Sequence, residues 1–395
     1  MAVMNRMSTK SVPGEAAVRD ETIDGEPAVF LRAGDYLAAA LPGVGGNLFR
    51  LVDERRQLTI LHEPPNVREL REHPVIYGIP ALFPPNRIRD GVFTANGIRY
   101  ELPVNTRDNN HCHGMLARRP WQVTRLCASH APAAQVRAAG GSVTAGTAPS
   151  VCLEAAGASR TGTGPVPGSA AAGSVATEPV AELEMSFTAE KGSEHYGLFP
   201  HRFVYRNRYI LSRFGLRQEI AIENLDDRPL PLGVGFHTAF HIPFVNGSSP
   251  ENCRLRVSVG TRWEFDGRIL PTGNTIPDHE GKRRYLGDGI HPTEPGFEEH
   301  WSTEPMEHRG GAFRGAVITD RVHGYAIEYE LGPSFIYTMI WNSRGGKGVV
   351  CAEPMTWMID APNMKLPPSV TGFRMLDRGE TFRDRTEIRV VEATG

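Results

Sequence analysis

The chain has 395 residues, of which 43 are Lys or Arg and 45 are Asp or Glu, and its formal net charge is -2 at pH 7. Because these charges balance, the composition excludes the broad basic surface that binds nucleic acid or anionic lipid, so we expect neither as a partner. The five cysteines are scattered and include no CxxC pair, which favours reduced thiols in a cytoplasmic protein over a disulfide framework.

Residues 1–26 carry several charges and no continuous apolar segment, so they lack the core of a secretory signal. No later run reaches the roughly 18 apolar residues that a membrane helix requires. We therefore expect a loose N-terminal tail over residues 1–26 and a cytoplasmic location.

The next stretch consists of short apolar or alternating runs separated by Gly, Asp and Pro: AVFLRAG, YLAAALP, NLFRLVD and QLTIL. This spacing predicts β-strands, and only residues 66–72 have the pattern of a helix. Pro-Pro-Asn-Arg-Ile at residues 84–88 is typical of a turn, and Asn-Gly at residues 96–97 predicts a hairpin. Short strands thus tie Arg87 and His113 to a sheet that can hold both toward one pocket.

Residues 131–177 differ from their surroundings, because they contain no aromatic residue and are mostly Ala, Gly, Ser, Thr and Pro. Such a segment offers too little apolar area to offset the ordering entropy of its backbone, roughly 1–2 kcal/mol per residue. A linker between two domains is the alternative. Since the alternation that begins at Trp121 resumes at Glu182, we interpret the segment as a disordered insert in one domain of residues 27–395.

The strands after this insert are longer and more regular: LRQEIAIEN from Leu216, CRLRVSV from Cys253 and AIEYEL from Ala326. In each, apolar side chains alternate with charged or polar ones, which predicts antiparallel strands with one buried and one solvated face. No βαβ alternation is present, which argues against Rossmann and TIM architectures. The fold class that we expect is all-β.

Three separated segments occur in a recognisable order and strand context. Residues 86–121 run from Asn-Arg-Ile through the hairpin to His-Gly and Trp, GFHTAF occupies residues 235–240, and CAEPMTWMIDAPN occupies residues 351–363. Together they resemble the aldose 1-epimerases, also called galactose mutarotases, over most of the chain outside the tail and the insert. The resemblance implies a large twisted antiparallel β-sandwich of the galactose mutarotase type and a monosaccharide substrate.

The resemblance also implies roles for five residues. Glu353 would be the general base and His237 the general acid, while His113 polarises the sugar and Arg87, with Asn86 beside it, holds its hydroxyls. The histidine of this family works without metal, so we expect no metal and no cofactor. Without the resemblance, an acid at a strand end such as Glu353 is ordinarily solvated, and a histidine in an apolar setting such as His237 is ordinarily a core residue.

Some of these assignments have a direct competitor nearby. His241 is the fallback acid if the strand register is displaced, and Arg87 in a turn would by default pair with Asp90. The chain also departs from the family pattern, with Met115 in place of a second glycine and Thr238-Ala239 in place of Pro-Tyr. Glu298 and Glu299 are the candidates for the family's substrate-binding Asp, which has no secure counterpart.

The function that we expect is interconversion of the α and β anomers of a free hexose, such as glucose or galactose, by general acid and base catalysis. A phosphosugar 1-epimerase is an alternative, since guanidinium binds phosphate well and four arginines lie in this region: Arg87, Arg89, Arg118 and Arg119.

Two further alternatives come from other classes of protein. A metal-dependent, cupin-like enzyme would use His111 and His113, which face the same way if both lie on one strand, together with His237 and Glu353. A non-catalytic sugar-binding protein is the third alternative, and the presence of both Glu353 and His237 argues against it. Which sugar is bound, and the oligomeric state, do not follow from the sequence.

Overall fold

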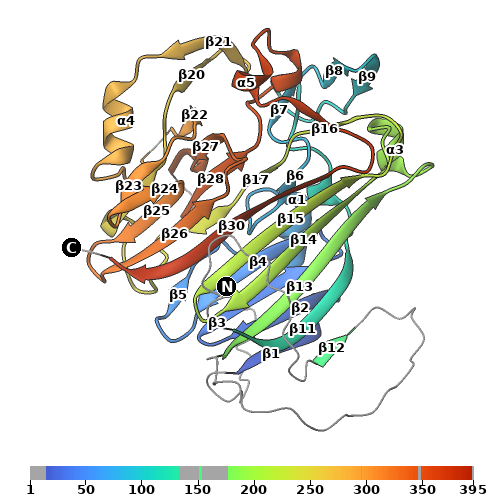
Figure 1. Ribbon diagram of the computed structural model, residues 1–395. Coiled ribbons are helices and arrows are strands. Elements are labelled where there is room, and N and C mark those ends of the chain that lie inside the picture. The colour runs from blue at the N-terminus through green and yellow to red at the C-terminus, as the bar shows by residue number, and fades with distance from the viewer. Residues whose placement is uncertain (1–14, 133–150, 154–176, 295, 346–347, 394–395) are drawn as a thin grey trace, which may run out of the picture.

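The computed structural model describes residues 15–132, 151–153, 177–294, 296–345 and 348–393 (Figure 1). Within these residues, antiparallel sheets of five, nine and eight strands form most of the structure, and four two-stranded pairs complete it. The all-β expectation is confirmed. The α-helices are short: α1 (Val67–Glu72), α3 (Glu194–Leu198), α4 (His279–Leu286) and α5 (Pro368–Thr371). None of the helices described is long and apolar enough to cross a bilayer.

The five-stranded sheet follows the chain from β1 to β5 without a crossover. Its strands are β1 (Ala16–Ile23), β2 (Glu26–Ala33), β3 (Tyr36–Leu41), β4 (Asn47–Asp53) and β5 (Leu58–Thr59). β1 pairs with β2 along its whole length, so the expectation of a loose tail up to residue 26 is wrong for residues 16–23. The physical reason is that one edge of β2 would otherwise have unpaired backbone N–H and C=O groups. A short polar strand can form hydrogen bonds with these groups.

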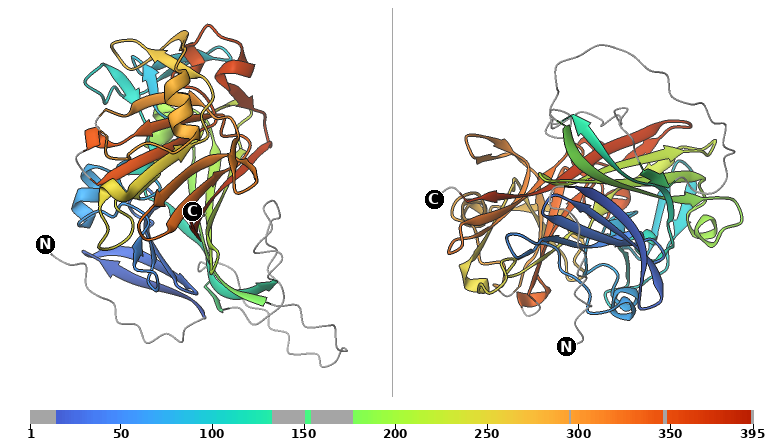
Figure 2. Two further views of the ribbon diagram at one scale, coloured as in Figure 1. Left: turned by 90° about the vertical axis from the view of Figure 1, so that its left-hand side faces the viewer. Right: turned by 90° about the horizontal axis from the view of Figure 1, so that it is seen from below.

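The nine-stranded sheet has the order β12-β11-β13-β14-β15-β30-β26-β25-β19. Its strands are β11 (Gln122–Pro132), β12 (Val151–Leu153), β13 (Thr177–Ala189), β14 (Phe203–Ser212), β15 (Gly215–Asn224), β19 (Cys253–Val257), β25 (Gly315–Asp320), β26 (Tyr325–Leu331) and β30 (Thr381–Glu392). Figure 2 shows the blue five-stranded sheet lying against the green strands of this sheet, and the two share one core that includes Leu31, Leu183 and Tyr205.

The eight-stranded sheet supplies the strands nearest the candidate site. Its order is β21-β20-β22-β27-β28-β17-β6, and β18 also pairs with β28. The strands are β6 (Ala81–Leu82), β17 (Gly235–Phe236), β18 (Ala239–His241), β20 (Arg262–Phe265), β21 (Pro271–Ile276), β22 (Glu298–Ser302), β27 (Tyr337–Trp341) and β28 (Val349–Met355).

Four small antiparallel pairs lie outside the three sheets. They are β7 (Arg87–Arg89) with β10 (Asn110–Cys112), β8 (Val92–Ala95) with β9 (Ile98–Glu101), β16 (Leu230–Leu232) with β29 (Arg374–Leu376), and β23 (Met306–His308) with β24 (Gly311–Phe313). The predicted hairpin is the β8–β9 pair, and Asn96 and Gly97 at its tip have φ of 47° and 74°. Asn and Gly accept this left-handed geometry more readily than other residues.

The predicted insert of residues 131–177 falls largely outside the described residues. Its two ends are described: β11 and β13 pair antiparallel, with Pro132 opposite Thr177. The segment between them therefore joins neighbouring strands, as the resumed alternation indicated. One part of the insert differs from the expectation of a loop, because residues 151–153 form β12 on the open edge of β11. That edge offers unpaired backbone groups, which a short segment can satisfy.

Candidate active site

Backbone geometry turns His113 away from the strand that precedes it. β10 ends at Cys112, and His113 has a left-handed φ of 67° and donates its N–H to the carbonyl oxygen of Asn86 at 3.0 Å. Gly114 follows with φ of 64°, and a Cβ added there would lie 2.2 Å from the carbonyl oxygen of Phe83. Only glycine allows this approach, which brings the loop of Asn86 beside His113.

Sheet register places His237 opposite Glu353. His237 lies between β17 and β18, and both strands pair with β28, through Gly235 with Met355 and through Ala239 with Cys351. The same antiparallel register puts His237 across from Glu353. An acid at a strand end is ordinarily solvated, but Glu353 lies within β28, and its side chain is only 2% exposed.

His113, His237 and Glu353 form one cluster, which we call the His–Glu cluster. Nε2 of His237 lies 3.1 Å from Oε1 of Glu353, and the rings of His113 and His237 meet edge to face with centroids 5.1 Å apart. One ligand-forming atom from each of the three lies within 4.8 Å of the others. Oε2 of Glu353 and Nδ1 of each histidine have no hydrogen-bond partner among the described residues. These three atoms are therefore buried without a protein partner in the described part of the chain.

Burial shifts the pKa of each group in the His–Glu cluster toward its uncharged form. It raises the pKa of Glu353 well above its usual value, and it lowers the pKa of His237 to about 4. The pKa of His113 lies well below its usual value, because of burial first and then the charges of His237 and Arg87. Burial therefore favours the uncharged arrangement of the Glu353–His237 contact, in which the two groups share one proton.

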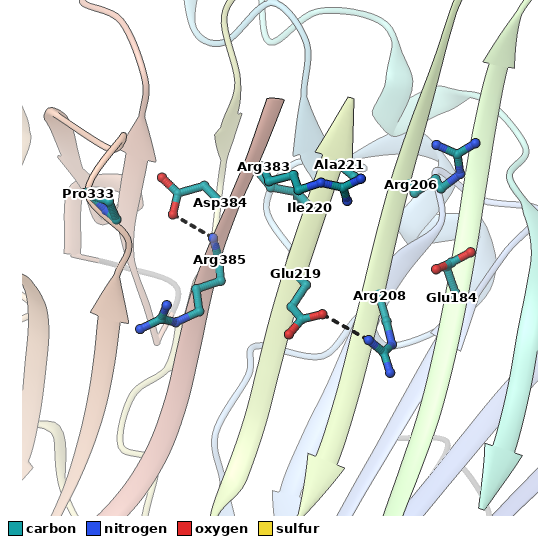
Figure 3. Close-up of a pocket in the computed structure, with 10 residues that line it drawn as sticks. All are labelled: Glu184, Arg206, Arg208, Glu219, Ile220, Ala221, Pro333, Arg383, Asp384 and Arg385. Atoms are coloured by element: carbon teal, nitrogen blue, oxygen red, sulfur yellow. Dashed lines mark hydrogen bonds and ion pairs between the residues drawn. The ribbon is translucent and has the colours of Figure 1, made fainter. Parts of the chain in front are cut away.

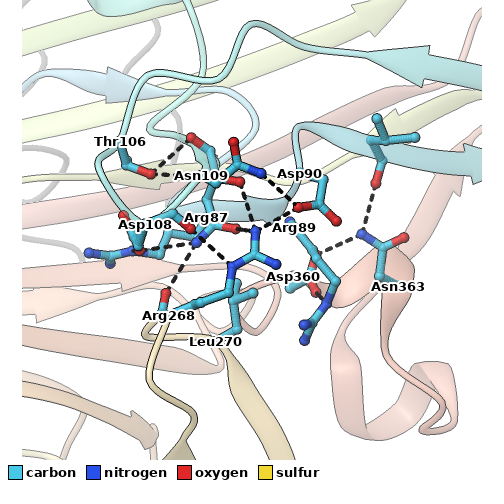
Figure 4. Close-up of polar contacts among 12 residues, drawn as sticks. Arg87, Arg89, Asp90, Thr106, Asp108, Asn109, Arg268, Leu270, Asp360 and Asn363 are labelled. Carbon is cyan, nitrogen blue, oxygen red and sulfur yellow. Dashed lines mark hydrogen bonds and ion pairs between the residues drawn. The ribbon is translucent and has the colours of Figure 1, made fainter.

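Two carboxylates hold Arg87 near the His–Glu cluster, and Figure 4 shows one of them, Asp108. Its guanidinium donates from Nε to Asp108 at 3.2 Å and from Nη2 to Glu298 at 3.2 Å. The side-chain oxygen of Asn86 accepts from the Arg87 backbone N–H at 2.9 Å. Because Asn86 is buried, with 1% of its surface exposed, this bond fixes the backbone of Arg87. The positive charge of Arg87 favours the ionised form of Glu353 and lowers its pKa, against the larger effect of burial.

Of the other candidate carboxylates near the site, Asp90 and Glu299 bond residues other than Arg87. The default pairing of Arg87 with Asp90 does not occur, because Asp90 accepts from Arg268 at 2.7 Å. Glu299 accepts from Tyr285 and Trp301, whereas Glu298 bonds Arg87, since neighbouring residues of β22 point to opposite faces. Of the two candidates for the family's substrate-binding Asp, the structure therefore brings Glu298 to the site.

Two other histidines lie outside the His–Glu cluster. His111 is 1% exposed and its Nδ1 bonds the carbonyl oxygen of Pro103 at 2.7 Å. The metal-dependent alternative required His111 and His113 on one strand, but β10 ends at Cys112 and His113 has left-handed backbone. His111 is not among the three residues whose ligand-forming atoms lie within 4.8 Å of one another. His241 stacks on His62 with ring centroids 5.8 Å apart and is not part of the cluster.

The four arginines considered for phosphate binding do not converge. Arg89 pairs with Asp360 at 3.3 Å, Arg118 donates to the carbonyl oxygen of Arg71, and Arg119 pairs with Glu194 at 2.5 Å. Arg87 alone reaches the edge of the His–Glu cluster.

The sequence analysis missed two residues of this region, Asp108 and Trp341. Asp108 anchors Arg87, and the ring of Trp341 lies 5.4 Å from that of His237. Trp341 belongs to no motif that we identified. The one signal in the sequence was a tryptophan at the end of an apolar run, YTMIW, shortly before the Glu-Pro segment. In the structure this run is β27, and Trp341 lies opposite Cys351 of β28.

Comparison with known proteins agrees with this arrangement. The family model described as aldose 1-epimerase matches residues 27–138 and 174–389, and the gap falls inside the predicted insert. The solved structure of a galactose mutarotase-like protein from Clostridium acetobutylicum is 30% identical, with a TM-score of 0.81, over 96% of this chain and 99% of that one.

Two more distant relatives extend the comparison. A galactose 1-epimerase from Lactobacillus acidophilus is 11% identical with a TM-score of 0.62, over 96% of this chain and all of that one, which shows the shared fold alone. The uncharacterized protein YihR of Escherichia coli is 37% identical over 103 residues, which are 26% of this chain and 31% of that protein. The expected galactose mutarotase-type β-sandwich is confirmed, and the chain belongs to the aldose 1-epimerase family.

Proposed function

We propose that this protein is an aldose 1-epimerase that interconverts the α and β anomers of a free hexose such as glucose or galactose. The observation that carries the proposal is the direct contact of a buried carboxyl group and a buried imidazole, Glu353 Oε1 and His237 Nε2, 3.1 Å apart. A base and an acid held side by side are what opening a sugar ring requires, since one proton leaves the anomeric hydroxyl and another reaches the ring oxygen.

In the proposed reaction, Glu353 removes the proton of the anomeric hydroxyl while His237 protonates the ring oxygen. The bond between the anomeric carbon and the ring oxygen breaks, and the open-chain aldehyde forms. Rotation about the first carbon–carbon bond presents the other face of the aldehyde, and the same two groups working in reverse close the other anomer. Each positioned proton transfer is typically worth roughly 10²–10⁴ in rate.

The shared proton must lie on His237 when Glu353 acts as the base. Burial opposes this charged arrangement, and the positive charge of Arg87 favours it by stabilising the ionised carboxylate. His113 is neutral at physiological pH and polarises the sugar through a hydrogen bond, not through a full charge. We assign Arg87 and Glu298 to the sugar hydroxyls, with Asn86 positioning Arg87.

Polarimetry tests this function directly. Purified protein should accelerate the mutarotation of freshly dissolved α-D-glucose or α-D-galactose. Glu353→Gln should lower turnover at least roughly 10²-fold while sugar binding persists. The matched control Glu304→Gln, at a half-exposed glutamate that pairs with Lys282, should keep the full rate. Sugar binding without any turnover by the wild type would instead identify a non-catalytic sugar-binding protein.

A metal-dependent sugar enzyme is the second candidate, because His113, His237 and Glu353 can each offer one ligand atom within 4.8 Å of the others. Two imidazoles and a carboxylate are a common ligand set for zinc and iron. Under the proposed mechanism, overnight chelation followed by desalting should leave the mutarotation rate unchanged. Loss of most activity with recovery on adding zinc or iron would favour the metal-dependent enzyme.

A further inference from the structure

A cavity of about 550 Å³ lies against the edge of the nine-stranded sheet and shares no residue with the His–Glu cluster. We call it the arginine cavity. Four arginines and one histidine surround it: Arg254, Arg256, Arg309, Arg321 and His308. One carboxylate residue, Asp288, is also in its lining.

The sheet explains why cationic and apolar groups meet here. β19 pairs with β25, so that Arg254 lies opposite Thr319 and Arg256 opposite Val317, and these four side chains share one face. Ala326 of β26 and Val391 of β30 continue the apolar surface of that face, as members of a small hydrophobic cluster that also includes Ala393. The cavity therefore has an apolar floor and a cationic rim.

Backbone carbonyl groups, not carboxylates, hold the four guanidinium groups. A carbonyl oxygen accepts a hydrogen bond and fixes the side chain without cancelling its charge. The bonds run from Arg254 to Glu251 and Cys253 at 2.8 Å each, from Arg256 to Leu286 at 3.0 Å and Glu307 at 2.8 Å, from Arg309 to Glu392 at 2.9 Å, and from Arg321 to Asp288 at 2.9 Å.

Carboxylates neutralise this rim only weakly. Asp288 lies 4.0 Å from Arg321 and its side chain is 98% exposed. Glu328 bonds His308 at 2.7 Å and so matches the histidine of the rim, whereas it lies 3.9 Å from Arg309. Arg254 and Arg256 form no ion pair with any residue that the structure describes. Burial lowers the pKa of Arg256, and its Nε has no hydrogen-bond partner within the described part of the chain.

Another groove on this sheet shows that such a charge excess is not general. It lies across β13, β14, β15 and β30 and is also rich in arginine (Figure 3). There Arg208 pairs with Glu219 at 3.2 Å and with Glu182 at 2.8 Å, and Arg206 pairs with Glu223 at 3.0 Å. Arg206 and Arg208 of that groove are thus matched by carboxylates of neighbouring strands, whereas no carboxylate lies closer than 3.9 Å to an arginine of the arginine cavity in the part of the chain that the structure describes.

We propose that the arginine cavity is a binding site for a phosphate monoester whose remaining part is apolar or aromatic. Guanidinium groups bind phosphate oxygens in pairs of hydrogen bonds, and a doubly charged phosphate matches several cations better than a carboxylate does. The apolar floor takes the organic part of the ligand. Sites for small molecules usually enclose about 300–1,000 Å³, a range that includes this cavity.

Calorimetric titration of the full chain with four probes tests the proposal. The probes are phenyl phosphate, phenol, inorganic phosphate and glucose 6-phosphate. Phenyl phosphate should bind at least about tenfold tighter than inorganic phosphate or glucose 6-phosphate, because it alone also covers apolar surface. Phenol should not bind measurably, and added salt should weaken the binding of phenyl phosphate.

Three variants locate the site. Arg256→Gln and Arg321→Gln should each weaken phenyl phosphate binding at least about tenfold, because each removes a charged hydrogen-bond donor. Arg321 is half-exposed, so its variant should fold even if the loss of Arg256 disturbs the sheet edge. Arg68→Gln, on the exposed face of α1, removes the same charge elsewhere and should bind as the wild type does.

Three results would overturn the proposal. Absence of saturable phenyl phosphate binding to the wild type would refute the anion site itself. Unchanged affinity in Arg321→Gln would place any bound phosphate outside this cavity. Equal affinity for glucose 6-phosphate and phenyl phosphate would refute the role of the apolar floor.

Discussion

The ionisable groups of the His–Glu cluster are shifted toward their uncharged forms, whereas the arginines of the arginine cavity stay charged. In the cluster, Glu353 and His237 are buried in contact, and each has its pKa shifted toward the uncharged form. In the cavity, the charged groups are guanidiniums, which do not lose their proton near neutral pH, and carbonyl oxygens hold them without neutralising them. The first arrangement is suited to moving a proton, and the second to holding an anion.

The difference has a physical origin in what surrounds each group. Glu353 is covered by its own sheet and by the loop of His113, so desolvation dominates its energetics. Arg256 lies on the edge strand β19, and its guanidinium donates to the carbonyl oxygens of Leu286 at the end of α4 and of Glu307 in β23. A titratable group becomes useful for catalysis when burial brings its two protonation states close in free energy. A guanidinium group, by contrast, can bind an anion whenever no neighbouring carboxylate competes for it.

We expect the largest loss of turnover from substitutions in the His–Glu cluster itself. His237→Asn should lower turnover at least roughly 10²-fold, as should Glu353→Gln, and the double variant should cost little more than either, because the two transfers belong to one event. His241→Asn is the matched control, and we expect it to be close to silent. Additive losses in the double variant, measured by polarimetry, would show that the two groups act in separate steps.

The pH dependence of the mutarotation rate tests the protonation state of the Glu353–His237 pair. In the proposed mechanism the working form of this pair carries one proton. As pH falls through about 4, His237 takes up a second proton and the rate should fall. As pH rises through the raised pKa of Glu353, the pair loses its only proton and the rate should fall again. The rate should therefore be bell-shaped in pH, with its acidic limb near 4.

Histidine NMR checks the same assignment without turnover. The imidazole of His237, identified by its absence in His237→Asn, should stay neutral down to about pH 4. A signal that titrates near the unperturbed value of about 6.5 would contradict the assignment.

Arg87→Gln should have an intermediate effect. It removes a charge that favours ionised Glu353 and a donor to the sugar, so we expect KM to rise and turnover to fall, each by about tenfold. Arg119→Gln, at an arginine that pairs with Glu194 elsewhere, should leave both constants unchanged. Kinetics with both anomers would separate the two effects, and a change in KM alone would limit Arg87 to binding.

A smaller effect tests whether the two sites are independent. Arg256→Gln should keep mutarotation within about twofold of the wild type, because distant sites without shared partners act additively. Saturating phenyl phosphate should likewise leave the rate of the wild type unchanged. A large change in either experiment, followed by polarimetry, would mean that the arginine cavity regulates the His–Glu cluster.

The smallest effect concerns the insert. Pro132 of β11 and Thr177 of β13 are opposite each other, so a Gly-Ser turn of a few residues can replace residues 133–176. We expect the fold to persist and Tm to change by less than about 4 °C. Thermal unfolding followed by circular dichroism would check this, and insoluble protein would show that the segment is structurally required.

Much of the fold followed from local patterns. Alternation along residues 216–224 and 326–331 predicted antiparallel strands, and the structure confirms them as β15 and β26. The helix predicted over residues 66–72 is α1, with Asn66 as its N-cap. Such signals depend on neighbours in the chain, so sequence alone contains them. The candidate residues of the site came from three separated motifs, and the structure brings His113, His237 and Glu353 together.

Only the tertiary structure decided the remaining points, because each depends on contacts between distant segments. The φ of His113 separates it from His111, and a hydrogen bond to Asn86 holds it there. Pairing of β22 with its neighbours selects Glu298 over Glu299, since alternate residues take opposite faces. The arginine cavity joins residues from 254 to 393, and no local pattern distinguishes its unneutralised arginines from those that neighbouring strands match with carboxylates. Periodicity along the chain determines which face a side chain takes, whereas the partner on that face is set by the sheet order.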